Sequence, residues 1–316
     1  CEVKKATVGF LAGTGSAVIM GLSWYATKRI SQISGAFIID VLATRYLISG
    51  GVLLLLWVFG KIRLHFEKKD IVPLLGLSLL MPVLYNILEY TAISYISTAE
   101  IGMLCSLSTV VASLMGYLIL KEPVGKAEAA FMVLAVSGVI FTNVFDFDVH
   151  DSSNIGRLLM LGCVLASSLN RILSRKLSSY KTVTEITAIM MWSAAVAFSG
   201  IAFGRHLLEG SMNEYVDFIR EPRVYGYLIF LSIGCSLLGF WLNNVAIANL
   251  AMTQSSVLIT ISTIVAVVSG AILLQEPLKW YDYVGCFIIL TGVTGCNITK
   301  SDPICDYRSA KGKEMK

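Results

Sequence analysis

A segment of roughly 52 residues occurs twice in this chain, and the two copies lie 154 positions apart. Residues 92–143 align without a gap on residues 246–297, with about 14 identical positions. Both copies are almost wholly apolar, although each contains a Glu-Pro pair, at residues 122–123 and 276–277. An internal duplication in an apolar chain is typical of membrane proteins that are built from two related halves, usually transporters.

Composition places the whole chain in a membrane. Hydrophobic residues make up 56% of the 316 residues and charged residues 15%, whereas a soluble domain needs more polar residues to cover its surface. The apolar runs are too many and too long to be one signal peptide. The net charge of +4 fits basic cytoplasmic loops and says nothing in favour of nucleic acid. We therefore predict a multi-pass protein surrounded by the lipid bilayer, with no nucleic-acid partner.

Ten apolar segments approach the ~20 residues that are needed to cross the hydrocarbon core of a bilayer. Charged or polar loops separate these segments, among them a long loop predicted at residues 205–224. Within the third segment, Pro82 is expected to kink the helix inside the membrane. The predicted spans are residues 7–27, 36–59, 71–92, 98–120, 126–144, 156–174, 184–204, 225–247, 253–274 and 281–299.

The basic residues predict the orientation of these spans. With the N-terminus inside, the inner segments hold 17 of the 25 lysines and arginines, including Arg171, and the outer loops hold seven. This bias favours both termini in the cytoplasm. Because the second repeat copy begins five spans after the first, its orientation is reversed. We predict an all-α polytopic fold of ten transmembrane helices, arranged as inverted five-helix repeats at 1–150 and 151–300 with a cytoplasmic tail at 301–316. Inverted repeats are the geometric basis of alternating access.

The duplicated strings also carry a family resemblance. Leu-Ile-Leu-Lys-Glu-Pro at 118–123 and Leu-Leu-Gln-Glu-Pro at 273–277 each precede a helix with a glycine motif, at Gly138 and Gly292. Over residues 7–299 the chain resembles the EamA-type ten-helix members of the drug/metabolite transporter superfamily. The resemblance implies a central cavity lined by helices one to four and six to nine. It also implies peripheral fifth and tenth helices at which a homodimer would form.

From these features we expect a secondary active transporter in the plasma (inner) membrane that carries a small polar or amphiphilic metabolite by alternating access. An amino-acid-like solute is the leading expectation. The alternatives are an uptake permease or exchanger for a phosphorylated or quaternary-amine solute, and a lipid-carrier flippase or sensor on the same fold. The sequence contains no Walker A string, so ATP is not the expected energy source.

An intramembrane enzyme is the least favoured class. Its active site would need His, Asp or Cys side chains clustered at depth, and His65, His150 and His206 are all predicted to lie in loops. The seven cysteines are odd in number and show no metal-ligand spacing, so we expect small buried hydrophobes rather than a disulfide framework. We predict no catalytic residue, no metal site and no cofactor.

Arg45 is the first candidate site residue, because it lies about ten residues into the second span. A charge at the bilayer centre costs about 2.5–3.5 kcal/mol on insertion scales, so Arg45 must face protein or water. It would anchor a carboxylate or phosphate of the substrate, or else bond to helix carbonyls or a neighbouring acid. Trp192 stands 147 positions later at the matching depth of the seventh span, where it would stack on a substrate or simply pack. Asp40 is expected to be interfacial.

Glu89 is the second candidate, in the outer third of the third span together with Asn86 and Tyr90. Its equivalent in the second repeat is Asn243, which Asn244 follows. Polar groups at mirrored depths predict outer and inner gates. Glu89 would also couple transport to protons if burial raised its pKa, whereas the alternative is an interfacial residue that reaches the headgroups.

Small polar residues line the fourth and ninth predicted helices. Ser108 and its repeat equivalent Ser262 would offer hydroxyl groups to a substrate, although close helix packing explains small residues equally. The duplicated acids Glu122 and Glu276 precede prolines, which disfavour helix at the preceding residue. We interpret these two acids as marking turns.

Overall fold

The computed structural model describes residues 2–35, 37–65, 68–108, 110–112, 114–115, 125–145, 151–178, 180–250, 252–276 and 278–299. Across these residues the structure is helical and contains no β-strand. Six helical segments are long and apolar enough to cross a membrane: Thr7–Ser34, Ile38–Val58, Val72–Ile93, Asn154–Ser174, Val183–Glu209 and Pro222–Asn249. An all-α polytopic fold is therefore confirmed, while ten spanning helices in inverted repeats stay a prediction.

The first half of the chain supplies seven described elements. They are α1 (Glu2–Ser34), α2 (Ile38–Val58), α3 (Lys68–Ser78), the π-helical segment η1 (Leu79–Leu84), α4 (Tyr85–Ile93), α5 (Thr98–Ser106) and α7 (Lys126–Phe145). Ser97 caps α5, because its hydroxyl accepts from the backbone amide of Glu100 at 3.1 Å and so satisfies an otherwise orphaned donor. The predicted turn at Glu122 and the tail at 301–316 lie outside the described residues.

The second half corrects one prediction. Its elements are α8 (Asp151–Leu177), α9 (Val183–Glu209), α10 (Met212–Arg220), the 3-10 turn η2 (Pro222–Val224), α11 (Tyr225–Ile229), the π-helical segment η3 (Phe230–Gly239), α12 (Phe240–Asn249), α13 (Met252–Leu273) and α14 (Trp280–Thr299). Residues 205–224 are therefore mostly helical, and the predicted long loop is wrong. Their polar side chains find partners within the fold, so α9 continues until Gly210, whose φ of +67° ends the helix in the left-handed conformation that suits glycine.

The predicted kink in the third span is confirmed. Met81 has an extended backbone, with φ −146° and ψ 120°, inside the π-helical segment η1. The ring of the following Pro82 disfavours the α conformation at the preceding residue and removes a backbone donor. The interruption lies directly before Tyr85 and Asn86, which both face the cavity described below.

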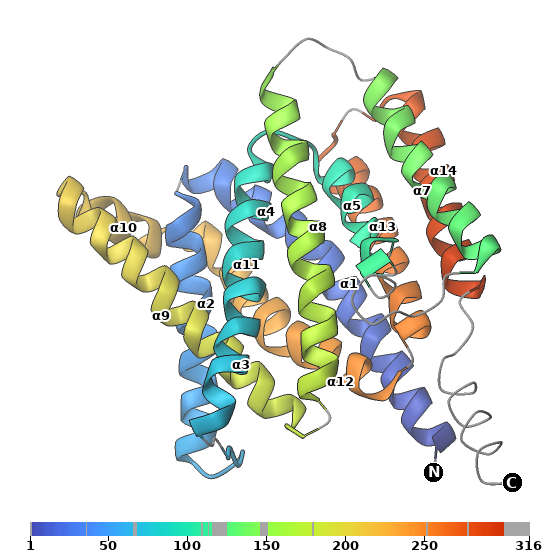
Figure 1. The fold of residues 1–316 in the computed structure, drawn as a ribbon. Helices are drawn as coiled ribbons and strands as arrows, with labels where there is room; N and C mark the ends of the chain where they lie inside the picture. Colours follow the sequence, from blue (N-terminus) through green and yellow to red (C-terminus); the bar gives the residue numbers. More distant parts are fainter. Residues whose placement is uncertain are drawn as a thin grey trace, which may run out of the picture.

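The helices of the two halves interleave around a common centre. α1 packs against α12 and α13, α2 packs against α9, and α4 packs against α8. α7 and α14 instead lie side by side at one edge of the molecule (Figure 1). Gly292 allows this contact, since a Cβ atom there would lie 2.4 Å from the backbone nitrogen of Ala135. The central part of the molecule is therefore formed by helices other than α7 and α14.

Ion pairs join elements that are distant in the sequence. Lys28 Nζ lies 2.6 Å from Glu276 Oε1, and the Glu276 carboxylate also accepts from the backbone amide of Thr98 at 3.0 Å. Glu276 thus links α1, the start of α5 and the α13–α14 turn, which fits its predicted role at a turn. Elsewhere, Lys181 Nζ lies 2.5 Å from Asp70 Oδ2, and both side chains are buried.

Candidate functional site

A cavity of about 130 Å³ lies between α1, α2, the kinked α3–α4 segment, α5, α8, α12 and α13. This volume has room for on the order of ten water molecules. Many polar groups line it, although polar groups are expensive to bury without partners. The charged lining residues are Arg45, Glu89 and Arg171, the amides are Asn86, Asn170 and Asn243, and the hydroxyls include Ser16, Ser23, Tyr85, Ser108, Ser167 and Ser262.

Arg45 brings a cation to the cavity wall from α2. Its side chain is only 3% exposed. Nε donates to Ser236 Oγ at 2.5 Å, and Nη1 donates to the hydroxyl of Tyr90. The guanidinium also lies 5.4 Å from the ring centroid of Tyr46, within the range of a cation–π contact. These neighbours orient the guanidinium, but the two hydroxyls are neutral and do not compensate its charge.

Glu89 brings a carboxylate to the same wall from α4. Trp24 Nε1 and the Tyr85 hydroxyl both donate to Glu89 Oε1, at 2.8 and 2.5 Å. Both bonds end on the same oxygen, and Oε2 accepts no bond from the described residues. The structure therefore holds the Glu89 carboxylate firmly at the cavity wall, with one oxygen unused.

Two lining residues on α8 are not among the site residues predicted from the sequence. Arg171, predicted among the basic residues of the inner segments, lines the cavity wall without a hydrogen bond or ion pair to any described residue. Its neighbour Asn170 is 3% exposed, and Asn170 Oδ1 is buried without a hydrogen-bond partner among the described residues. The sequence contained a signal for both residues, because each is a polar or charged residue within the predicted membrane span 156–174.

Four further predicted residues line the cavity, namely Asn86, Asn243, Ser108 and Ser262. Asn86 is tied down by Nδ2, which donates to the hydroxyl of Tyr46 at 2.9 Å and to the carbonyl of Pro82 at 2.6 Å. The second bond fastens the side chain to the kink in the third span. The structure thus brings these four residues together with Arg45 and Glu89.

The remaining three predicted residues do not line the cavity. Tyr90 lies behind Arg45 and accepts hydrogen bonds from Arg45 and Thr27. Trp192 donates from Nε1 to the carbonyl of Gly50 at 3.1 Å and packs edge-on against another tryptophan. Asn244 donates to Thr187 Oγ1 at 3.0 Å. The contacts of Trp192 and Asn244 are of the helix-packing kind.

Residues at equivalent positions of the two sequence halves recur in the wall of this cavity. Glu89 and Asn243 are 154 positions apart, as are Ser108 and Ser262. At the offset of 147, Trp24 corresponds to Arg171 and Ser23 to Asn170, and all four residues line the cavity. The wall is therefore built from corresponding places in the two halves, although the side chains at those places differ.

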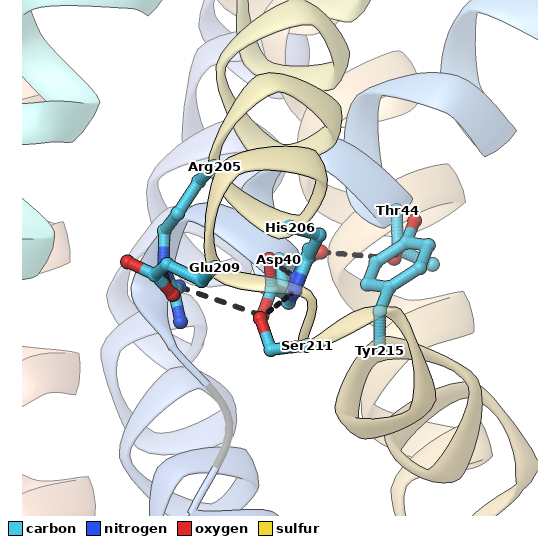
Figure 2. Close-up of polar contacts among 7 residues, drawn as sticks. All are labelled: Asp40, Thr44, Arg205, His206, Glu209, Ser211 and Tyr215. Atoms are coloured by element: carbon cyan, nitrogen blue, oxygen red, sulfur yellow. Dashed lines mark hydrogen bonds and ion pairs between the residues drawn. The ribbon is translucent and has the colours of Figure 1, made fainter.

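Figure 2 shows a second polar cluster, none of whose members is among the residues that line the cavity. We call it the helix-end cluster; its members are Asp40, Thr44, Arg205, His206, Glu209, Ser211 and Tyr215. His206 Nε2 lies 2.9 Å from Asp40 Oδ1, and His206 Nδ1 lies 2.8 Å from Ser211 Oγ.

The helix-end cluster corrects one expectation. His206 is in α9 and 1% exposed, so the loop position predicted for it is wrong. Asp40 lies in the first turn of α2 and is 2% exposed, and its predicted interfacial depth stays a prediction. The polarity of the segment suggested a loop, but the contact between these two side chains allows both to be buried. Within the described part of the chain, no group of three or more His, Cys, Asp and Glu residues is arranged to hold a metal ion.

Comparison with known proteins identifies the family. The model of the EamA-like transporter family matches residues 7–144 and 154–298. The uncharacterized transporter YcxC of Bacillus subtilis is 31% identical over 293 residues, which cover 92% of this chain and 93% of that protein. A probable amino-acid metabolite efflux pump of Escherichia coli is 21% identical over 57% of this chain and 60% of its own length.

A crystal structure with 14% sequence identity superposes with a TM-score of 0.65 and covers 92% of this chain and 97% of its own. At this identity the likeness concerns the fold alone. The two matched segments of the family model correspond to the two sequence halves that the repeat defines. This multi-pass membrane protein therefore belongs to the EamA-like transporter family, within the drug/metabolite transporter superfamily.

Proposed function

We propose that this protein is a secondary active transporter, not an enzyme, which carries a small polar, amino-acid-like metabolite across the plasma (inner) membrane. The solute binds in the central cavity, and two inverted five-helix halves expose that cavity to each side in turn. Both termini lie in the cytoplasm. The observation that carries the proposal is a cavity between helices of both halves that contains cations, a carboxylate and neutral amides.

The chemistry of the cavity supports an amino-acid-like solute. A guanidinium recognises a carboxylate through paired hydrogen bonds, and the Glu89 carboxylate has an oxygen available for an ammonium group. The name of the Escherichia coli relative, an amino-acid metabolite efflux pump, agrees with this chemistry. A quaternary amine has no anion to offer Arg45, so it uses only part of the cavity wall.

A kink in one half and a π-helical segment in the other support alternating access. η1 covers residues 79–84, and the equivalent residues 233–238, at the offset of 154, fall within η3. π-helical turns frequently occur at functional sites, and kinks are where helices bend. We propose these two segments as the hinges, because each adjoins helical residues that line the cavity, α4 in one half and α12 in the other.

The test is solute flux in proteoliposomes that contain the purified full chain. Radiolabelled amino acids, amines, nucleosides and sugar phosphates are screened with and without an inward proton gradient. Saturable flux of amino acids, reduced by excess unlabelled amino acid, is the expected result. Flux of sugar phosphates or of quaternary amines alone would contradict the amino-acid assignment while keeping the transporter. Comparison of inward and outward gradients separates uptake from export.

A lipid substrate gives a different outcome. If the whole panel of soluble solutes shows no flux, the same vesicles are tested for movement of a fluorescent lipid between leaflets. Lipid movement without solute flux would overturn the proposal in favour of a flippase. Absence of both would favour a sensor.

A further inference from the structure

The described charged residues that line the cavity do not balance one another. Two are guanidinium groups, Arg45 and Arg171, and one is the carboxylate of Glu89. No ion pair joins any two of these three residues within the described part of the chain. With Glu89 ionised, the wall carries a net charge of +1, and a buried charge without a counter-ion is costly.

The wall also has unused hydrogen-bonding capacity of a definite kind. A guanidinium carries five N–H donors. Arg45 uses Nε and Nη1, whereas Arg171 bonds to no described residue. On the acceptor side, Glu89 Oε2 receives no bond from a described residue, and Asn170 Oδ1 is buried without a partner in the same part of the chain. Two donor groups and one acceptor region are therefore available to a ligand.

We propose that the cavity selects an amino acid with an acidic side chain, which carries two carboxylates and one ammonium group. This inference rests on the proposed function and names the charge of its solute. One carboxylate binds Arg45, the other binds Arg171, and the ammonium group lies at Glu89 Oε2 and Asn170 Oδ1. Such a solute has a net charge of −1 and neutralises the wall.

Solutes of other charge leave a group unpaired. A zwitterion with a neutral side chain uses one guanidinium and leaves the second buried without an anion. A dicarboxylate that lacks an amino group faces the Glu89 carboxylate with nothing to bridge the like charges. Tyr85 belongs to the same wall, and its hydroxyl bonds to Glu89. Arg171 is therefore the residue that determines specificity for the second carboxylate.

The experiment compares near-isosteric solutes in the same proteoliposomes. Fluxes of L-glutamate, L-glutamine and glutarate are measured as kcat/KM, because the first two differ in the charge of one group and the third lacks the amino group. L-Glutamate is expected to exceed each of the others about tenfold or more, which is the effect of one hydrogen-bonded charge. Flux of L-glutamine equal to that of L-glutamate would overturn the inference and leave the transporter standing. Absence of flux for every amino acid would instead contradict the proposed function.

A variant of Arg171 tests whether this residue causes the preference for L-glutamate. Arg171→Gln should lower the ratio of L-glutamate flux to L-glutamine flux from about tenfold or more to about one. Arg157→Gln is the matched control on the same helix, since Arg157 pairs with Glu100 and does not line the cavity. Retained preference for L-glutamate in Arg171→Gln would overturn the role of Arg171. If that variant does not fold, the ratio measured on the unmodified protein still decides whether the solute is acidic.

Discussion

The central cavity and the helix-end cluster both bury charged side chains, but among the described residues of these two regions only those of the helix-end cluster form ion pairs with one another. Asp40 contacts His206 through one oxygen and lies 3.9 Å from Arg205 through the other. In the cavity, neither the Arg171 guanidinium nor Asn170 Oδ1 has a hydrogen-bond partner in the described part of the chain. A complete set of partners indicates a structural role, whereas an incomplete set at a cavity wall indicates a place for a ligand.

The largest loss of stability is expected from a substitution in the helix-end cluster, where the charged side chains have partners. Asp40→Ala leaves the buried His206 without its hydrogen-bonded carboxylate, and leaving a buried polar group unsatisfied costs about 1–3 kcal/mol of stability, more if the group is charged. Thermal unfolding of the detergent-solubilised protein measures this loss. Asp40→Asn is the control, because its side-chain oxygen still accepts a hydrogen bond, so its loss should be clearly smaller. Equal losses in the two variants would show that the contact with His206 is not what stabilises this region.

Arg45→Ala tests the opposite case, a charge with an incomplete set of partners. We expect the protein to stay folded and the affinity for an anionic amino acid to fall about 10- to 100-fold, the size of one charged hydrogen bond. Equilibrium binding and thermal unfolding are measured together, with Arg45→Lys as the variant that keeps the charge. Unchanged affinity with lowered stability would make Arg45 a structural residue, like those of the helix-end cluster.

Glu89→Gln separates the structural role of Glu89 in the cavity wall from a role in proton coupling. The amide oxygen still accepts from Trp24 and Tyr85, so stability should change little, while the group that could exchange a proton is gone. Initial transport rates with and without an inward pH gradient should become equal in the variant. If the gradient still accelerates transport through Glu89→Gln, then Glu89 is not the proton-coupling site.

Trp192→Phe should have the smallest effect. The variant loses the hydrogen bond to the carbonyl of Gly50, which contributes about 1 kcal/mol, but it keeps an aromatic ring for packing. Because Trp192 does not line the cavity, kcat/KM for the solute should remain that of the unmodified protein. A large change in KM without a change in thermal unfolding would place Trp192 in the substrate path.

Arg171 shows why part of the site escaped prediction. A basic residue three positions from the end of a predicted span can reach the membrane surface or turn inward, and hydropathy does not distinguish the two. Trp192 shows the converse, since its depth matches that of Arg45 although its ring packs elsewhere. In membrane helices the lipid-facing and protein-facing sides are both apolar, so the periodicity that marks the buried face of a soluble helix is weak.

The sequence by itself determined the membrane class, the duplication, the family and the kink at Pro82, because hydropathy, self-similarity and proline sterics are local properties of the chain. It also singled out Arg45 and Glu89, since a charge deep in a span is costly wherever it points. Only the tertiary structure decided which polar groups share a cavity and that Arg171 and Asn170 belong to it. It also decided that His206, at the end of α9, contacts Asp40 of α2. Those outcomes depend on how helices from the two halves pack, and packing brings together residues more than a hundred positions apart.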